Sequence, residues 1–319
     1  MLIKIVGLHA PHAPRLRALL GPEHEVQSLD SFPPTGEIHA DVVISNSVSA
    51  DEAARLRCRL VHVPGAGSEQ IACRSLSAGT TVCNVHGHEV PIAEFTLHAI
   101  LEHYLKLWQY PARLDAAAWA ASYSKRAPHD EAHGKSVAIV GFGHIGQEIT
   151  RRARAFDMHV IAVTRSGRQG PAELAHEYVQ AAALDEVLPR AQVLVICCPL
   201  DDSTRGLIAE RRLALLPPGA LLVNVARAEV VDEQALYEAL SQQRLGRAVL
   251  DVWYQYPNKG QAPVPPSRWP LHELTNVRCT PHISAITPAL LERRYSFMAR
   301  NITRLQQAQA LENVIYLAP

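Results

Sequence analysis

Several features are scarce or missing in this chain of 319 residues, and each absence excludes a class of protein. Its 31 basic and 31 acidic residues leave no net charge, so we expect binding neither to nucleic acid nor to a membrane surface. Lysine occurs at only five positions, and this bias toward arginine weakens any inference from one arginine alone. No window approaches the roughly twenty apolar residues of a membrane-spanning helix.

Paired cysteines and a leader sequence are also missing. The six cysteines include no C-x-x-C pair and no Cys/His spacing typical of zinc, so we expect reduced core thiols and no metal site. Residues 1–8 form an apolar run that is too short for a signal peptide and lacks a small-residue cleavage pattern. We therefore expect a first β-strand there, in a cytoplasmic protein.

What the chain does contain is an apolar run over 136–140 that ends in G-x-G-x-x-G and continues as helix-like sequence over 147–156. A lone glycine pattern is weak evidence, but the order strand, turn, helix gives each glycine a role. Gly141 permits a tight turn, Gly143 lets the backbone approach a pyrophosphate, and Gly146 lets the helix pack close to the strand. The helix N-terminus then faces the phosphates, which predicts a dinucleotide site.

Strand-like and helix-like segments alternate along the rest of the chain, which favours parallel sheets with helices on both faces. We expect strands over 2–8, 41–45, 60–63, 81–85, 160–163, 179–182, 193–197, 221–225 and 248–252, and helices over 13–20, 51–57, 90–109, 185–191, 209–216, 232–242 and 288–310. Residues 116–130 are expected to form a helix and a loop. Length favours about two domains. The predicted fold is α/β, with two doubly wound parallel sheets and ligands at the carboxyl ends of the strands.

A set of short motifs extends this prediction from fold to family. They lie at 141–146, 199–200, 203–208, 222–227, 231–233, 250–252 and 280–283. In order and spacing, over roughly residues 60 to 290, the chain resembles the D-2-hydroxyacid dehydrogenases, and among them the glyoxylate/hydroxypyruvate reductases. The resemblance implies a flavodoxin-like substrate domain, 1–110 and 286–319, interrupted by an NAD(P)-binding Rossmann domain, 111–285. It also implies hydride transfer between NAD(P)(H) and a small 2-keto or 2-hydroxy acid.

The resemblance also implies roles for single residues. Arg227 matches the substrate arginine, whose planar fork can bind a carboxylate or polarise a carbonyl, although on its own it reads as a surface residue. His282 matches the acid/base histidine, whose near-neutral pKa suits a proton that moves opposite the hydride. Beyond the glycines, the implied cofactor contacts are His144, Ile145, Cys198, Pro199, Thr204, Ala226, Asp251 and Ser284.

One position departs from the family near the implied catalytic histidine. The family commonly has a glutamate five residues after Asp251, paired with the histidine, but here that position is Tyr256. A neutral phenol favours the imidazolium less than a carboxylate does, so we expect a lowered pKa for His282, with Tyr256 as a catalytic candidate. Formate dehydrogenases of the same superfamily have a neutral glutamine there, and their substrate releases no hydroxyl proton.

The implied substrate loop is partly unusual. The backbone N–H groups of Gly65, Ala66 and Gly67 match the family's glycine loop, which holds the substrate carboxylate. His88, after Gly87, replaces the usual glycine-asparagine pair. We predict either a modified substrate pocket or two histidines that cap the next helix.

Cofactor choice depends on the residue about twenty positions beyond the glycines, where an acidic side chain binds the ribose hydroxyls of NAD. That position is Thr164, followed by Arg165 and Ser166, so no carboxylate repels a 2′-phosphate. We expect NADP to be preferred and NAD to remain possible. The alternative is that Arg165 is a solvated loop residue and that NAD binds weakly.

The resulting hypothesis is an NADP-preferring reductase of small 2-keto acids. Two alternatives stay open: oxidation of a formate-like or phosphite-like donor, and a non-catalytic protein that senses NAD(P). Family members usually form two-fold dimers, and the apolar stretch 112–123 is the expected interface of a homodimer.

Overall fold

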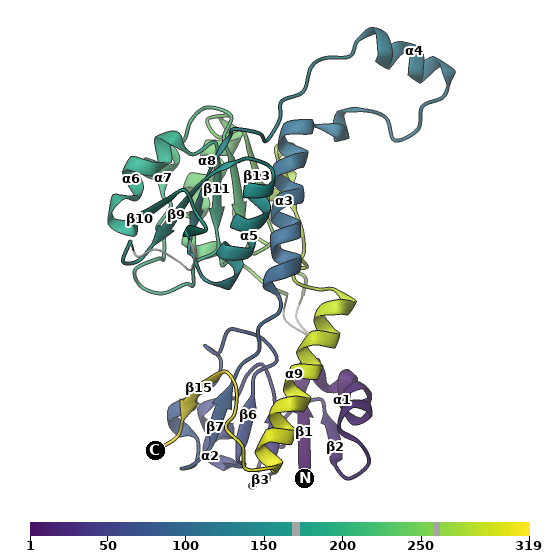
Figure 1. The fold of residues 1–319 in the computed structure, drawn as a ribbon, viewed down its shortest axis with the longest axis vertical. Coiled ribbons are helices and arrows are strands. Elements are labelled where there is room, and N and C mark those ends of the chain that lie inside the picture. Colours follow the sequence, from purple (N-terminus) through teal and green to yellow (C-terminus); the bar gives the residue numbers. More distant parts are fainter. Residues whose placement is uncertain (168–172, 258–261) are drawn as a thin grey trace. The chain divides into compact units, whose positions relative to one another are not determined.

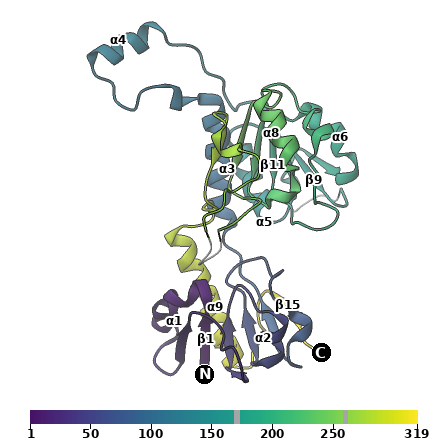
Figure 2. The same ribbon diagram turned by 180° about the vertical axis from the view of Figure 1, so that it is seen from behind.

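The structure is a computed structural model that describes residues 1–167, 173–257 and 262–319. It divides into two compact units, one of residues 1–88 and 286–319 and the other of residues 89–285 (Figures 1 and 2).

The first unit contains a six-stranded sheet in the order β15-β7-β6-β4-β1-β2. All strands are parallel except β15, which pairs antiparallel with β7. The strands are β1 Leu2–Val6, β2 Glu25–Leu29, β4 Val42–Ile44, β6 Leu60–His62, β7 Thr81–Cys83 and β15 Val314–Leu317, with a separate pair β3 Ile38–His39 and β5 Leu56–Arg57. The helices are α1 Ala13–Leu20, α2 Ala50–Arg55 and α9 Pro288–Gln306.

Both faces of this sheet are buried, as the apolar strand sequences predict. On one face, Ile3 and Ile5 pack with Leu16 of α1 and Tyr295 of α9. On the other face, α2 and the segments around it cover the strands, and Val43 lies in that second cluster. The sheet thus has the helical layers of a doubly wound fold.

The second unit contains seven parallel strands in the order β10-β9-β8-β11-β12-β13-β14. This order places β8 at the point where the winding reverses, as in dinucleotide-binding folds. The strands are β8 Ser136–Val140, β9 His159–Thr164, β10 Glu177–Gln180, β11 Val193–Ile196, β12 Leu221–Asn224, β13 Arg247–Leu250 and β14 Val277–Cys279. The helices are α3 Glu89–Leu105, α4 Ala116–Ser124, α5 His144–Ala155, α6 Leu184–Val187, α7 Glu210–Leu213 and α8 Glu233–Ser241.

Successive residues of the central strands alternate between two cores. Ile139 of β8 packs in the cluster that includes α3 and α5, whereas Val140 packs in the cluster that includes α6, α7 and α8. The same alternation appears in Val195 and Ile196 of β11. The predicted α/β fold is therefore confirmed.

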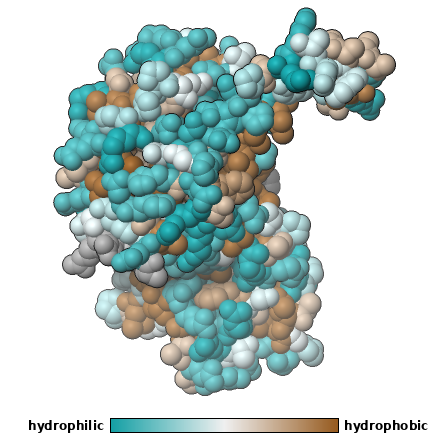
Figure 3. Space-filling model, turned by 45° about the horizontal axis from the view of Figure 1, so that its top comes forward, coloured by the Kyte–Doolittle hydropathy of each residue, from teal (hydrophilic) through white to brown (hydrophobic). Residues whose placement is uncertain are grey.

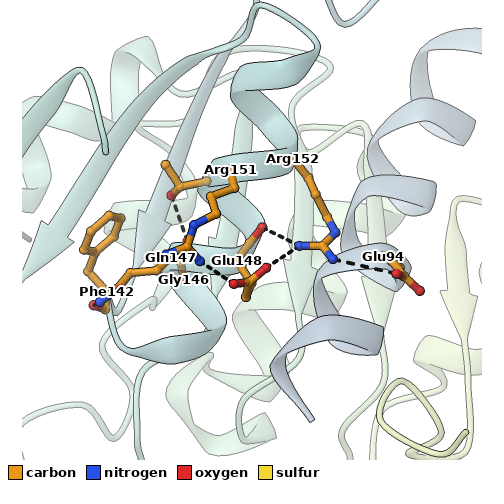
Figure 4. A network of polar contacts seen from close by, with 8 residues as sticks. Glu94, Phe142, Gly146, Gln147, Glu148, Arg151 and Arg152 are labelled. Carbon is orange, nitrogen blue, oxygen red and sulfur yellow. Dashed lines mark hydrogen bonds and ion pairs between the residues drawn. The ribbon is translucent and has the colours of Figure 1, made fainter. Parts of the chain in front are cut away.

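The position of α3 corrects the first predicted boundary, which placed residues 89–110 in the substrate domain. Ile92 and Ile100 of α3 are buried in the same core as Ile149 of α5, so the helix belongs to the second unit. Arg152 of α5 also bonds Glu148 at 2.5 Å and reaches Glu94 of α3 at 3.7 Å, as Figure 4 shows. Helix α3 therefore packs against α5 instead of closing the first unit.

Between α3 and β8 the chain forms an arm, residues 106–131, that carries α4 and stands away from the rest of the second unit (Figures 1 and 3). No residue of α4 is buried. In the part of the chain that the structure describes, no helix has both the length and the apolar character needed to cross a membrane.

Candidate active site

The glycine turn lies at the carboxyl end of β8 and leads into α5, as the sequence predicts. Gly141 has φ +101°, and a Cβ on it would lie 2.6 Å from the backbone nitrogen of Cys198. A Cβ on Gly146 would lie 2.3 Å from the carbonyl oxygen of Gly141, so helix and turn are in direct backbone contact. Gly143 is different, because a Cβ there would meet nothing within 4 Å. It faces open space at the N-terminus of α5, which is the free volume that a pyrophosphate requires.

The first residues of α5 follow this turn. His144 begins the helix and is exposed, whereas Ile145 is partly buried against the core beneath it. Gln147 donates a hydrogen bond from Nε2 to the carbonyl oxygen of Phe142 at 3.2 Å (Figure 4). The glycine turn is thus hydrogen-bonded to the helix that follows it.

A cleft of about 500 Å³ opens beside the turn, at the carboxyl ends of β8, β9 and β11. Thr164, Arg165, Cys198, Pro199 and Thr204 from the predicted cofactor set line it. No Asp or Glu is among its lining residues in the described chain. Residues of the loops after β8, β9 and β11 are therefore brought together where the fold predicts a nucleotide.

The donors in this cleft fit a ribose and its phosphates. The Oγ1 atom of Thr164 is buried and has no hydrogen-bond partner among the described residues, so a ligand hydroxyl or phosphate would satisfy it. Arg165 is 80% exposed and pairs with Asp201 at 2.8 Å. Ser166 next to it is exposed. The loop after β9 thus offers hydroxyls and a cation, although the cation already has a carboxylate beside it.

The loop after β11 is held by its own side chains. Thr204 Oγ1 accepts a hydrogen bond from the backbone N–H of Asp201 and donates one to the carbonyl oxygen of Pro199, both at 2.8 Å. Cys198 is buried, and burial raises the pKa of its thiol to about 11. It is therefore a neutral wall residue at physiological pH.

A second group of residues lies on the loops after β12, β13 and β14 of the same unit. The phenol oxygen of Tyr256 lies 2.8 Å from Nδ1 of His282, although 26 positions separate them. His282 has φ +57°, a left-handed conformation that is strained for a residue other than glycine. Such strain persists only where the surroundings enforce it, and here they aim the imidazole at the phenol.

A buried carboxylate holds the loop of His282 in place. The carboxylate of Asp251 is fully buried and accepts hydrogen bonds from Thr280 Oγ1 and from the backbone N–H groups of Ile283 and Ser284, at 2.6 to 2.9 Å. Asp251 therefore shapes the loop that carries His282. Ser284 is buried by the same contact.

Trp253 connects the two loops. Its indole N–H donates to the carbonyl oxygen of Thr280 at 2.8 Å, and its backbone N–H donates to the phenol oxygen of Tyr256 at 3.2 Å. Sequence reasoning missed this residue, because its role depends on contacts across 27 positions. Trp253 fixes both partners of the Tyr256–His282 contact.

Arg227 follows β12 and is exposed, with no carboxylate partner among the described residues. Its Nη1 donates to the carbonyl oxygen of Ala226 at 2.8 Å. Buried Asn224 fixes the turn, because its amide donates to the carbonyl oxygen of Arg227 at 3.0 Å and accepts from the N–H of Ala226 at 3.1 Å. Asn224 was also missed from the sequence, although a buried polar side chain at a strand end is a usable signal.

The charge of Arg227 affects the pKa values of both His282 and Tyr256. Partial desolvation by the surrounding loops lowers the pKa of His282, and the charge of Arg227 lowers it further, while Asp251 acts in the opposite direction. Desolvation raises the pKa of Tyr256, against the effect of Arg227. The predicted direction for His282 is confirmed, and desolvation is the largest cause. Arg227, Tyr256 and His282 thus form one electrostatic neighbourhood, in which Arg227 has no carboxylate partner among the described residues and Tyr256 contacts His282.

The remaining predicted residues belong to the first unit. Gly65, Ala66 and Gly67 lie in the loop after β6. This loop is tied to the strand beside it, because Asn84 donates from its amide to the carbonyl oxygen of Ala66 at 2.8 Å. The rings of His86 and His88 stack with centroids 6.1 Å apart, just before α3 begins.

Comparison with known proteins is consistent with this architecture. Residues 97–284 match the sequence profile of the D-isomer specific 2-hydroxyacid dehydrogenases, NAD binding domain. The chain is 37% identical over 180 residues to a glyoxylate reductase of Pyrococcus furiosus, covering 56% of this chain and 50% of that protein. It is 30% identical over 283 residues to a D-3-phosphoglycerate dehydrogenase of Methanocaldococcus jannaschii, covering 86% and 52%. The chain thus spans about half the length of these curated relatives.

Solved structures share the fold over nearly the whole chain. An NADPH-dependent glyoxylate/hydroxypyruvate reductase of Sinorhizobium meliloti, solved with NADP and sulfate, aligns with a TM-score of 0.77 at 23% identity, covering 98% of this chain and 97% of that chain. A 2-hydroxyacid dehydrogenase of Ketogulonicigenium vulgare aligns with a TM-score of 0.78 at 20% identity, covering 100% and 99%. With more than half of its length matched by the family profile, the chain belongs to the D-isomer specific 2-hydroxyacid dehydrogenases.

Proposed function

We propose that this protein reduces a small 2-keto acid to the 2-hydroxy acid, with NADPH as the preferred hydride donor. The observation that carries the proposal is the 2.8 Å contact between Tyr256 and His282, in the electrostatic neighbourhood of Arg227, which pairs with no carboxylate in the described part of the chain. A cation that no carboxylate neutralises is suited to an anionic substrate, and a positioned imidazole is suited to its carbonyl oxygen.

In this mechanism a bound nicotinamide supplies a hydride, and the protein supplies charge and a proton. Arg227 holds the keto acid through two parallel N–H donors and polarises it. His282 donates a proton from Nε2 to the oxygen that becomes the hydroxyl. The glycine loop 65–67 is retained as the proposed carboxylate ligand because of the sequence resemblance.

Tyr256 can form a hydrogen bond with His282 whether the imidazole is protonated or neutral. Its oxygen already accepts the N–H of Trp253, so one lone pair and the hydroxyl proton are left. The oxygen can accept Nδ1–H of the imidazolium, and the hydroxyl can donate to Nδ1 of the neutral ring. We therefore propose Tyr256 as the residue that orients His282 without adding a negative charge to the site.

To test this function, the protein is mixed with NADPH and a panel of 2-keto acids. NADPH consumption is measured from the fall in the absorbance of NADPH at 340 nm. We expect turnover with at least one small keto acid. Turnover of NADP⁺ with formate or phosphite alone would support donor oxidation. Binding of NADPH without turnover of any panel member would support a nucleotide sensor.

The proposed preference for NADP rests on the loop after β9. Thr164 stands where an NAD-specific site has a carboxylate, and its Oγ1 is buried without a partner in the described chain. Arg165 adds positive charge, but a 2′-phosphate must share it with Asp201, so we expect a modest preference. The absence of a carboxylate at Thr164 is thus the proposed basis of cofactor choice.

Thr164→Asp is expected to weaken NADPH binding by about tenfold or more, because like charges then meet at the 2′-phosphate, and to favour NADH. The measurement is the dissociation constant of each cofactor by fluorescence titration. Thr164→Val is the matched control, since it removes the hydroxyl without adding charge. Equal constants for NADPH and NADH in the native protein would contradict the preference.

We also propose a homodimer formed through the arm, residues 106–131. Four large apolar side chains of the arm are 55 to 56% exposed: Trp108, Leu114, Trp119 and Tyr123. Exposed apolar side chains gathered on one segment are typical of an interface, and symmetric dimers are the commonest oligomers. Figure 3 shows hydrophobic side chains on this arm.

Light scattering at micromolar concentration is expected to give twice the chain mass. Replacing both Trp119 and Tyr123 by alanine should shift the protein toward the monomer, because their rings lie side by side, 5.2 Å apart, on the exposed helix. Leu8 is 85% exposed but lies outside the arm, so Leu8→Ala is the control. A monomeric native protein would contradict the proposal.

A further inference from the structure

The second unit has a smaller pocket of about 240 Å³ at the edge of the sheet opposite the cofactor cleft. Lys135, Gln192 and Ala220 line it, and each directly precedes a strand, β8, β11 and β12 respectively. The pocket therefore lies at the amino ends of the strands, and the proposed hydride transfer makes no use of it.

One wall of this pocket contains a donor without an acceptor. Tyr104, near the end of α3, is only 5% exposed, and its hydroxyl is buried with no hydrogen-bond partner among the described residues. Burial, with a contribution from Asp130, raises the pKa of Tyr104 to about 12, so the hydroxyl stays protonated. Native proteins leave few such groups unpaired, and each points to a missing partner.

The same pocket is surrounded by positive charge. Lys106 is exposed and has no ion-pair partner in the described parts of the chain, and its φ of +51° is strained for lysine. Lys135 lies over the ring of Tyr104 at 5.5 Å and bonds Asp130 at 2.8 Å. Burial and the charges of Arg247 and Lys106 lower the pKa of His103 to about 4. The described lining of the pocket contains two lysines but only one acidic residue, Asp130, and Asp130 is already paired with Lys135.

We propose that this pocket binds a small oxyanion, a phosphate or a carboxylate, held by the Lys106 ammonium and the Tyr104 hydroxyl. A charged oxygen is the acceptor that both groups lack, and charge-assisted hydrogen bonds are the strong ones. The volume fits an ion or a small acid and excludes a nucleotide, since sites for larger ligands occupy about 300 Å³ or more.

The site joins the two ends of the arm. Lys106 is the first residue of the arm, Asp130 lies near its end, and the backbone N–H of Asp130 donates to the carbonyl oxygen of Tyr104 at 3.2 Å. A bound anion would add a second link at this point. We expect the anion to bind here whether or not the chain is a reductase.

The test is the thermal unfolding of the full chain against increasing inorganic phosphate, at constant ionic strength and with saturating NADP to occupy the cofactor cleft. Succinate is titrated in parallel to separate a carboxylate from a phosphate ligand. We expect a saturable rise in Tm with at least one of the two anions.

Two variants locate the site. Tyr104→Phe is expected to weaken anion binding about tenfold while leaving the anion-free Tm unchanged or higher, because it removes only the unpaired hydroxyl. Lys106→Asn should weaken binding to a similar extent and keep the left-handed backbone, which asparagine tolerates. Lys125→Asn, at an exposed position of the arm, is the matched control. The inference is overturned if neither anion raises the Tm, or if both variants bind the anion as tightly as the native protein.

Discussion

Replacing His282 by asparagine is expected to lower kcat/KM for 2-keto acid reduction by about 10²–10⁴, the usual contribution of a positioned acid. The backbone should tolerate the change, because φ at this position is +57° and asparagine is among the residues that accept a left-handed conformation. NADPH binding should stay near native, since the cofactor cleft is formed by other loops. The variant therefore separates proton donation from cofactor binding.

His272→Asn is the control for this experiment. His272 lies in the same unit, in the short helix Leu271–Glu273, and its Nε2 lies 3.8 Å from exposed Glu273. Its replacement should leave the rate unchanged. If the His282→Asn protein retains near-native activity, the proton comes from another group, and Glu89 or His88 becomes the next candidate.

The second large effect is expected at the glycine turn. One alanine substitution there should lower stability, and another should weaken cofactor binding without changing the fold. Gly146→Ala would force a Cβ to within 2.3 Å of the Gly141 carbonyl, so the helix must move away from the strand. Overpacking of this kind costs about 1–3 kcal/mol, which corresponds to a fall in Tm on the order of 5 °C. Cofactor binding should fall with it, because the turn itself is displaced.

Gly143→Ala should instead leave the fold intact. Its backbone, with φ −77° and ψ −159°, suits alanine, and the added Cβ meets no protein atom within 4 Å. If the open space there is the pyrophosphate site, the methyl group should weaken NADPH binding by about tenfold or more. Calorimetric titration with an unchanged Tm checks this, and native affinity in Gly143→Ala would refute the assignment of the turn.

The parts of the fold that could be predicted are those with a strong local pattern. The buried strands of both sheets carry unbroken apolar runs, and the glycine turn combines strand, turn and helix signals. Strand β2, Glu25–Leu29, was missed because only Val26 is buried at this sheet edge. Strand β15, Val314–Leu317, was missed for a similar reason, since it is an edge strand with three exposed residues.

The domain boundary illustrates a second limit. The sequence correctly predicted a long helix over 90–109, but it did not predict which element the helix packs against. Periodicity shows that one face of a helix is buried, and it does not show which element covers that face. The contact of Ile100 with the core around α5 could be found only from the structure.

Only those residues of the candidate site that belong to a recognised motif could be predicted from the sequence. The family motifs singled out Arg227 and His282, and the departure from the family pattern drew attention to Tyr256. The contacts that define their behaviour span the chain: Tyr256 to His282 over 26 positions and Arg165 to Asp201 over 36. Such pairs depend on tertiary packing, which a single sequence does not encode in a local pattern.

The most direct measurement is the pH dependence of kcat/KM for one keto acid, in the native protein and in Tyr256→Glu. Reduction consumes a proton, so the active form of His282 is the imidazolium, which is lost as pH rises through its pKa. Because that pKa is lowered, the native rate should decline as pH rises through a value below about 6.5. A carboxylate beside the ring would favour the imidazolium and shift the decline to higher pH. Tyr256→Phe, which removes the contact without adding charge, should not shift it upward. Profiles that are identical in the native and Tyr256→Glu proteins would contradict the proposal that His282, oriented by Tyr256, delivers the proton.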